Sequence, residues 1–259
     1  TEVENLIEQT SENSRQLIRM IPFLKGMDTA LAKQSSDQIT HAFEQHWSLF
    51  QLHNGIETIR FYNQSDQLLV GWDNFEEDMQ RDALILEQVH GVNSQELPAS
   101  LLICIESCLQ YTIEPLLIDG VRTGAIVIGA SLADVFLGFK RTFGSDIGLL
   151  LKMKAENLAI QQNDVTFLNW GVRVAALTDR EKNLEILNRV AEMRPKIQDL
   201  RVGIHTEWDD RHHRIKLLSL RGVNLSDRAY LVVLTDITPT IHSIRDSTWR
   251  IIIIGLVGL

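Results

Sequence analysis

The sequence predicts an α+β fold in which a long N-terminal helix precedes two modules built on antiparallel sheets, and the start of an apolar helix ends the chain. Two observations carry this prediction. Apolar side chains recur at helical spacing over the first residues, and strand-like alternation followed by helix-like periodicity then occurs twice along the chain. We expect N-terminal helices over 1–50, a first module over 51–145, a second over 146–238 and a terminal helix over 239–259.

The N-terminal segment is expected to be helical over residues 1–25. Spacings of four and three residues alternate along a seam of Val3, Ile7, Thr10, Ser14, Leu17, Ile21 and Leu24. Such a seam is typical of helices that pair in a parallel dimer, and it also suits an amphipathic helix that lies on its own domain. Pro22 is expected to bend or end this helix, and a second helix is expected over roughly 29–50.

The first module is expected to begin with the strands Ile56–Asn63 and Leu68–Trp72, which a polar turn joins. Alternation gives the first strand two faces, one with Ile59 and Phe61 and the other with Thr58, Arg60 and Tyr62. The polar residues 73–100 are then expected to form a helix near Glu76–His90 and a loop. A segment of this kind inside a sheet often covers a pocket.

A β-hairpin is expected next, with strands Leu109–Ile118 and Val121–Gly129. Asp119 and Gly120 stand between them, and Asp-Gly between two apolar runs favours a two-residue turn. Ser131 can cap the helix that follows.

The second module repeats this layout without repeating the sequence. A helix is expected over Arg180–Met193. Strands are expected over Ile147–Leu151, Val165–Leu177, Leu200–Trp208, His213–Arg221 and Ala229–Thr235. Thr238 is then expected to cap a helix with Pro239 at its first position.

The last nine residues, 251–259, form an uncharged apolar run. Trp249 and Arg250 stand just before it, as is typical of a membrane interface. A span needs about 20 residues, so we expect the run to be the start of a transmembrane helix. The alternative is a buried C-terminal strand or helix.

The composition excludes some classes of function. A net charge of −9 and a pI of about 5.4 argue against a nucleic-acid partner, because binding phosphates needs an excess of Lys and Arg. The chain lacks the G-x-S-x-G, P-loop, H-E-x-x-H and G-x-G-x-x-G motifs. We therefore expect neither an enzyme nor a bound cofactor.

Short motifs in this layout resemble a known family over roughly residues 1–250. They contain Cys104, Cys108, Tyr111, Pro115, Asp119, Gly120, Gly124, Gly129, Ser131, Asp134, Phe139, Gly144, Asp146, Leu218, Leu220, Gly222, Leu234, Asp236 and Thr238. With the order of elements, these residues resemble the double Cache region, which is the PAS-like extracytoplasmic sensor of bacterial histidine kinases, diguanylate cyclases and chemoreceptors.

The resemblance implies a function for each part of the chain. Residues 51–145 correspond to the membrane-distal Cache module, which would bind a small molecule or a periplasmic binding protein, and 146–238 to the membrane-proximal module. The region would be periplasmic on the bacterial inner membrane, form a homodimer, and signal through membrane helices to a cytoplasmic output domain. Two alternatives remain: a membrane-anchored dimerisation or interaction module without a ligand, and an extracytoplasmic hydrolase.

Polar and aromatic residues on the sheet faces of the first module are the candidates for ligand binding. They are Arg60, Tyr62, Trp72, Tyr111 and Glu114, with His90 from the covering segment. A guanidinium can bind a ligand carboxylate through two hydrogen bonds, and aromatic rings can wall a pocket or hold a cation. Each of these residues, taken alone, also suits a core or surface position.

Cys104 and Cys108 are the only cysteines, and an even pair outside the cytoplasm suggests a disulfide. Along a continuous strand their Cα atoms would lie about 13 Å apart, whereas a bridge needs less than about 7 Å. A disulfide therefore requires a turn or a bulge at residues 105–107, and the alternative is two reduced, buried cysteines.

Possible metal ligands gather in the expected hairpin of the second module. They are His205, Glu207, Asp209, Asp210, His212 and His213. Alternation would distribute these side chains over both faces, and Asp is common in turns for backbone reasons. We expect no metal site.

Overall fold

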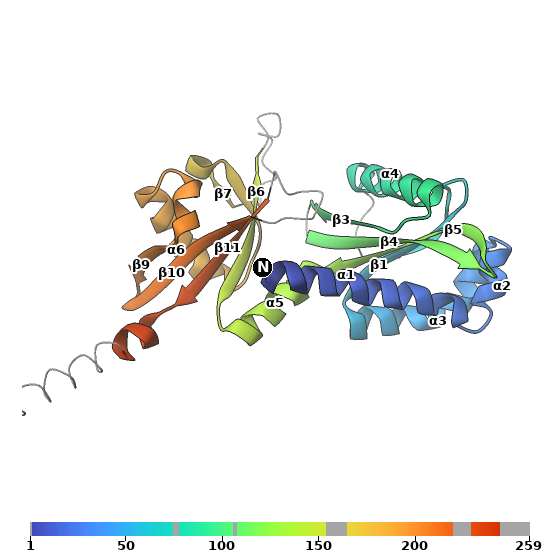
Figure 1. The fold of residues 1–259 in the computed structure, drawn as a ribbon, viewed down its shortest axis with the longest axis horizontal. Coiled ribbons are helices and arrows are strands. Elements are labelled where there is room, and N and C mark those ends of the chain that lie inside the picture. The colour runs from blue at the N-terminus through green and yellow to red at the C-terminus, as the bar shows by residue number, and fades with distance from the viewer. Residues whose placement is uncertain (1, 75–77, 106–107, 154–164, 220–228, 244–259) are drawn as a thin grey trace, which may run out of the picture. The chain divides into compact units, whose positions relative to one another are not determined.

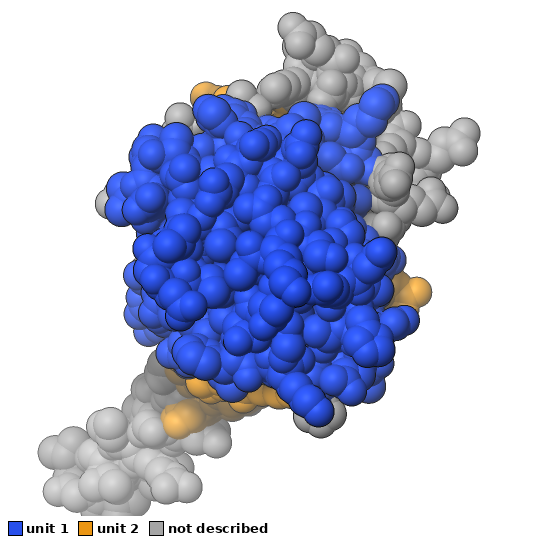
Figure 2. Space-filling view, turned by 90° about the vertical axis from the view of Figure 1, so that its right-hand side faces the viewer, with its two compact units in different colours: residues 1–135, 221–226 blue, residues 136–220, 227–259 orange. Residues whose placement is uncertain are grey.

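The computed structural model describes residues 2–74, 78–105, 108–153, 165–219 and 229–243 (Figure 1). The chain divides into two compact units, which Figure 2 shows in different colours. The first comprises residues 1–135 and 221–226, and the second comprises residues 136–220 and 227–259.

Three helices and a 3-10 turn open the first unit. They are α1 (Glu2–Met20), η1 (Ile21–Phe23), α2 (Met27–Ala32) and α3 (Ser36–Asn54). The second helix predicted near 29–50 is thus two helices, because Gln34 takes a positive φ of 50° and breaks the chain between them. Pro22 lies in η1, where α1 ends, as predicted.

The sheet of the first unit is antiparallel, in the order β2-β1-β5-β4-β3. Its strands are β1 (Ile56–Asn63), β2 (Leu68–Asp73), β3 (Ala99–Cys104), β4 (Cys108–Ile118) and β5 (Val121–Ser131). The Asp-Gly hairpin turn is confirmed, since Asp119 and Gly120 have φ of 51° and 76°. Strand β3 was not predicted.

Helices cover both faces of this sheet (Figure 1). The apolar cluster on one face includes Met27, Phe43 and Phe61 and involves the N-terminal helices. On the other face, α4 (Met79–Gln95) contributes Ile85 and Val89 to a second cluster.

Helix α1 packs on its own sheet. Its buried positions are Val3, Ile7, Ser11, Ser14 and Ile18, so the observed seam differs by one residue from the predicted one at two places. The Ser11 and Thr112 hydroxyl oxygens lie 3.2 Å apart between α1 and β4. The apolar seam of α1 therefore packs against the helix's own domain, which was one of the two arrangements that the spacing predicted.

The second unit contains a sheet in the order β7-β8-β6-β11-β10-β9. Helix α5 (Leu132–Phe143) precedes β6 (Asp146–Lys152), β7 (Thr166–Phe167), β8 (Val172–Leu177), α6 (Arg180–Met193), β9 (Ile204–Trp208), β10 (Arg211–Ser219) and β11 (Ala229–Asp236). The order β8-β6-β11-β10-β9 repeats β2-β1-β5-β4-β3, and α6 follows β8 as α4 follows β2. The predicted repeat of layout is thus confirmed, and α6 corresponds to α4.

Trp249 and the apolar run 251–259 lie outside the described residues. Within the described ranges, no helix has both the length and the hydropathy that a membrane span needs.

Candidate functional site

Arg60 is the centre of a charged cluster on the α4 face of the first sheet. Only 4% of the residue is exposed. Its Nε donates to Asp73 Oδ2 at 3.0 Å, and its Nη1 donates to Asp82 Oδ1 at 2.7 Å. Burial works against the charged guanidinium, but Asp73 and Asp82 outweigh it and raise the pKa of Arg60. The two carboxylates therefore keep a buried cation charged.

Two buried tyrosines lie on the same face as Arg60. Tyr62 follows Arg60 by two residues on β1, and Tyr111 lies on β4. Burial raises the pKa of both phenols, and a hydrogen bond with Arg60 opposes this at Tyr62. Their hydroxyl groups therefore remain protonated donors at neutral pH.

Gly129 on β5 allows Tyr111 to lie close to the sheet. A Cβ atom there would lie 2.4 Å from Thr58 Cγ2 and 2.9 Å from Tyr111 Cε1. Thr58 is fully buried, and its Oγ1 has no hydrogen-bond partner among the described residues. A buried hydroxyl without a partner is costly, which marks this place as one where a ligand or water would be stabilised.

The first turn of α4 completes the cluster. The Asp78 side chain caps the helix by accepting from the Arg81 N–H at 2.7 Å. The next residues bring Arg81, itself buried, and Asp82 over the sheet. Further along the helix, Ile85 and Val89 pack with Tyr62 and Tyr111. The site thus has a charged end and an apolar end.

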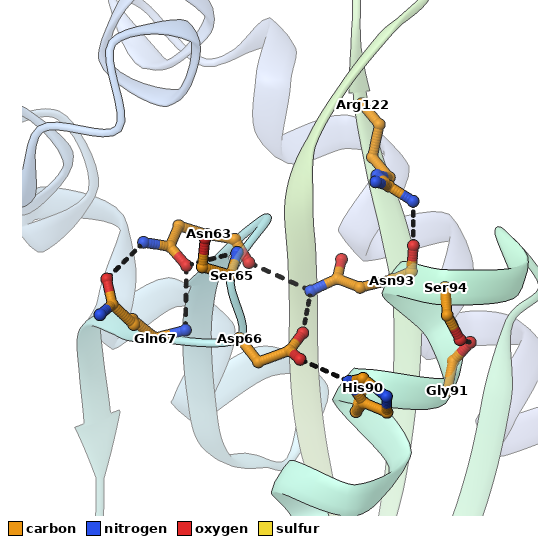
Figure 3. Close-up of polar contacts among 9 residues, drawn as sticks. All are labelled: Asn63, Ser65, Asp66, Gln67, His90, Gly91, Asn93, Ser94 and Arg122. Carbon is orange, nitrogen blue, oxygen red and sulfur yellow. Dashed lines mark hydrogen bonds and ion pairs between the residues drawn. The ribbon is translucent and has the colours of Figure 1, made fainter.

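A polar network fixes the C-terminal half of α4 (Figure 3). Asp66, in the β1–β2 turn, accepts from Asn93 Nδ2 at 2.6 Å and lies 2.7 Å from His90 Nδ1. Arg122 on β5 donates to the Asn93 carbonyl oxygen. Burial alone would raise the pKa of Asp66, but the bonds from Asn93 and His90 lower it. The helix is therefore fastened to both neighbouring hairpins.

The structure brings three of the six predicted ligand residues together: Arg60, Tyr62 and Tyr111. His90 lies on α4 with 75% of its side chain exposed, bound to Asp66 outside the cluster. Trp72 lies on the other face of the sheet, where its ring centroid is 4.9 Å from that of Phe43. It pairs with Ile59, so that its neighbours Gly71 and Asp73 share the face of Arg60.

Glu114 also lies on the other face, because it stands three residues after Tyr111 on the same strand. Its carboxylate lies 3.3 Å from Arg15 Nε and 3.7 Å from Arg19 Nη2 on α1. Burial raises the pKa of Glu114, and the two arginines oppose the shift. It belongs to the packing of α1 on β4.

The sequence did not identify Asp73, Arg81 and Asp82 as site residues. The sequence does contain an indication of Asp73 and Asp82. A buried arginine needs carboxylate partners, and the segment 73–82 is rich in Asp and Glu.

A disulfide joins Cys104 and Cys108, with Cα atoms 4.1 Å apart. The two cysteines are cross-strand partners in the pairing of β3 with β4. Among the described residues, no three or more His, Cys, Asp or Glu side chains are grouped as metal ligands would be.

Comparison with known proteins relates the chain to sensory domains. A family described as the double sensory domain of two-component sensor kinases matches residues 1–241. No curated protein sequence matches the chain.

The solved structures that match the chain share little sequence with it. One is the extracellular domain of a putative histidine kinase, with 12% identity, a TM-score of 0.49, and coverage of 91% of this chain and 88% of that one. A domain of a sensory box/GGDEF family protein from Vibrio parahaemolyticus has 12% identity, a TM-score of 0.48 and 91% coverage of both chains. The ligand-binding domain of the Pseudomonas fluorescens chemoreceptor CtaA, in complex with L-serine, has 10% identity, a TM-score of 0.43, and coverage of 88% and 93%.

Proposed function

Because the chain belongs to the family of double sensory domains of two-component sensor kinases, as the resemblance to double Cache regions predicted, we propose that its first unit binds a small polar molecule between α4 and the sheet. One observation carries this proposal. The buried Arg60, with its partly exposed partners Asp73 and Asp82, lies on the same face as the buried Thr58 hydroxyl, which has no partner among the described residues.

The charges of the cluster favour a ligand with groups of both signs. Arg60 and Arg81 supply two cations, and Asp73 and Asp82 supply two carboxylates. A ligand carboxylate would bind a guanidinium, a ligand ammonium would bind a carboxylate, and Tyr62 and Tyr111 would pack on its apolar part. A free amino acid is one molecule of this class.

The site lies on one face of a sheet whose other face packs against α1. A change in the sheet on ligand binding would therefore alter the packing of the N-terminal helix. We propose that the chain is the periplasmic region of a bacterial inner-membrane receptor, acting as a homodimer. Ligand binding would pass through flanking membrane helices to a cytoplasmic output domain. A ligand can act in this way only by binding one conformation more tightly than the other.

The test is the thermal stability of the purified chain with a panel of small zwitterions, anions and cations. A ligand at about 100 times its Kd should stabilise the protein by about 2.7 kcal/mol. The Asp82→Asn variant should lose this response, and Glu87→Gln, an exposed change on the same helix, should keep it. No stabilisation by any compound would contradict direct sensing and favour the interaction module without a ligand.

A further inference from the structure

His213 is a buried histidine in the second unit that the proposed ligand site does not use. It lies on β10 and is 2% exposed. Alternation places it on the same face as Ile215, which belongs to the apolar cluster that α6 covers. Its Nε2 has no hydrogen-bond partner within the described ranges. A titratable group without a partner in the core needs an explanation.

Charged groups face His213 from four elements. They are Lys182 on α6, Arg211 on β10, Asp236 on β11 and Asp146 on β6. Burial, followed by Lys182, lowers the pKa of His213, and Asp236 opposes the shift. From β9 come Thr206, its cross-strand partner, and Trp208, whose ring centroid lies 6.4 Å from that of His213. His213 is therefore neutral at neutral pH.

The two carboxylates differ in how they are held. Asp146 Oδ1 binds Lys140 Nζ at 2.8 Å and accepts from Thr178 Oγ1 at 2.8 Å, within the unit. Asp236 is the cross-strand partner of His213 and lies at the end of the last strand. Asp236 is thus the carboxylate whose partners include the segment that leaves the sheet.

Asp236 fastens that segment to the sheet. Its Oδ1 accepts from the Thr238 N–H at 2.9 Å, and its Oδ2 accepts from Arg211 Nη1 at 3.2 Å. Thr238 Oγ1 accepts from the His212 N–H at 2.8 Å, and the Ile237 N–H donates to the His212 carbonyl at 2.8 Å. The helical residues 238–243 begin at this point. Thr238 was predicted to cap this helix. Instead, the Asp236 carboxylate accepts the N–H at the start of the helix, and the Thr238 hydroxyl bonds to β10.

We infer that His213 and Asp236 form an acid-sensitive switch, in which a proton on His213 loosens the exit segment 237–243 from β10. A proton added to the imidazole makes both ring nitrogens donors, and Nε2 then requires an acceptor. Asp236, the neighbouring carboxylate on the next strand, supplies that acceptor. Its hydrogen bonds from the Thr238 N–H and from Arg211 are then weakened or broken. The switch does not depend on the proposed ligand site, so either can fail without the other.

The direction of the pH effect follows from the lowered pKa of His213. The stability contributed by the neutral ring is complete above the ordinary histidine pKa of about 6.5 and declines as the pH falls below it. In that window the ratio of folded to unfolded protein falls by at most about tenfold per pH unit. Above that pH, the exit segment stays fastened.

A spin label on the exit segment tests the switch. The only two cysteines are bonded to each other, so Ser243→Cys introduces a single free thiol at an exposed position. Label mobility should rise reversibly between pH 7.5 and pH 5, and the rise should be lost in His213→Gln. His205→Gln, an exposed change on the adjacent strand, should keep it. Both variants retain His242 beside the label, so a difference between them is due to His213 and not to protonation of His242.

Constant mobility between the two pH values, or an equal rise in His213→Gln, would overturn the inference. If His213→Gln does not fold, Asp236→Ala, which removes both acceptor oxygens, replaces it and should give a mobile label at both pH values. A label in Asp236→Ala that is as immobile at pH 7.5 as in the parent would likewise overturn it.

Discussion

Arg60 on β1 donates a hydrogen bond of 2.7 Å to Asp82 on α4, and this contact joins the sheet to the helix that covers it. Arg60 is 4% exposed, whereas the Asp82 side chain is 38% exposed, so water reaches this bond only from the side of the helix. Any movement of α4 away from the sheet must break this contact or replace it. A ligand that supplies its own carboxylate or ammonium group is a replacement of the right chemistry.

Asp82→Asn should lower the free energy of unfolding by about 1–3 kcal/mol, because a buried guanidinium loses one of its two carboxylates. Urea unfolding measures the loss. Glu87→Gln should change stability by no more than about 0.5 kcal/mol, since its side chain is exposed on the same helix. Equal effects of the two variants would show that Arg60 does not need Asp82.

Gly129→Ala and Gly138→Ala should act in opposite directions. A Cβ at position 129 would lie 2.4 Å from Thr58 Cγ2, and overpacking of this kind costs about 1–3 kcal/mol. A Cβ at position 138, in α5, meets nothing within 4 Å, so alanine should stabilise the helix by up to about 1 kcal/mol. Thermal melts of the two variants provide the comparison, and stabilisation by Gly129→Ala would contradict the close packing of Tyr111.

Asp146→Asn should destabilise the protein at pH 7 and have a smaller effect in acid. Burial would raise the pKa of Asp146, but Lys140 and Thr178 lower it below its ordinary value. Its contribution is therefore present above about pH 4 and is lost as the pH falls further. Urea unfolding of both proteins at pH 7 and pH 3.5 checks this, and a difference that stays constant would be inconsistent with the ion pair.

Reduction of the Cys104–Cys108 disulfide should lower the free energy of unfolding by about 2 kcal/mol, the value expected for so short a loop. The double variant Cys104→Ser/Cys108→Ser should start at this lower stability and should not respond to a reducing agent. A stability of the wild-type chain that reduction leaves unchanged would mean that the disulfide does not constrain the unfolded chain.

Side-chain alternation made much of the first sheet predictable. It placed Thr58, Arg60 and Tyr62 on one face and Ile59 and Phe61 on the other, as observed. The same rule places Tyr111 and Glu114, which are three residues apart on β4, on opposite faces of the sheet.

Register and packing could not be read from the sequence. The face of Trp72 depends on how β2 pairs with β1 after the turn, and a shift interrupts that pairing at Phe61 and Tyr62. A heptad-like seam buries α1 equally well against a partner helix or its own sheet, so its spacing alone does not choose between them.

Tyrosine-ring NMR tests the central claim most directly. The chain has three tyrosines, of which Tyr62 and Tyr111 lie in the proposed site and Tyr230 lies in the second unit as an internal control. Addition of a compound that stabilises the protein should shift the ring signals of Tyr62 and Tyr111 and leave that of Tyr230 unchanged. A stabilising compound that shifts only Tyr230, or none of the three, would contradict binding between α4 and the sheet.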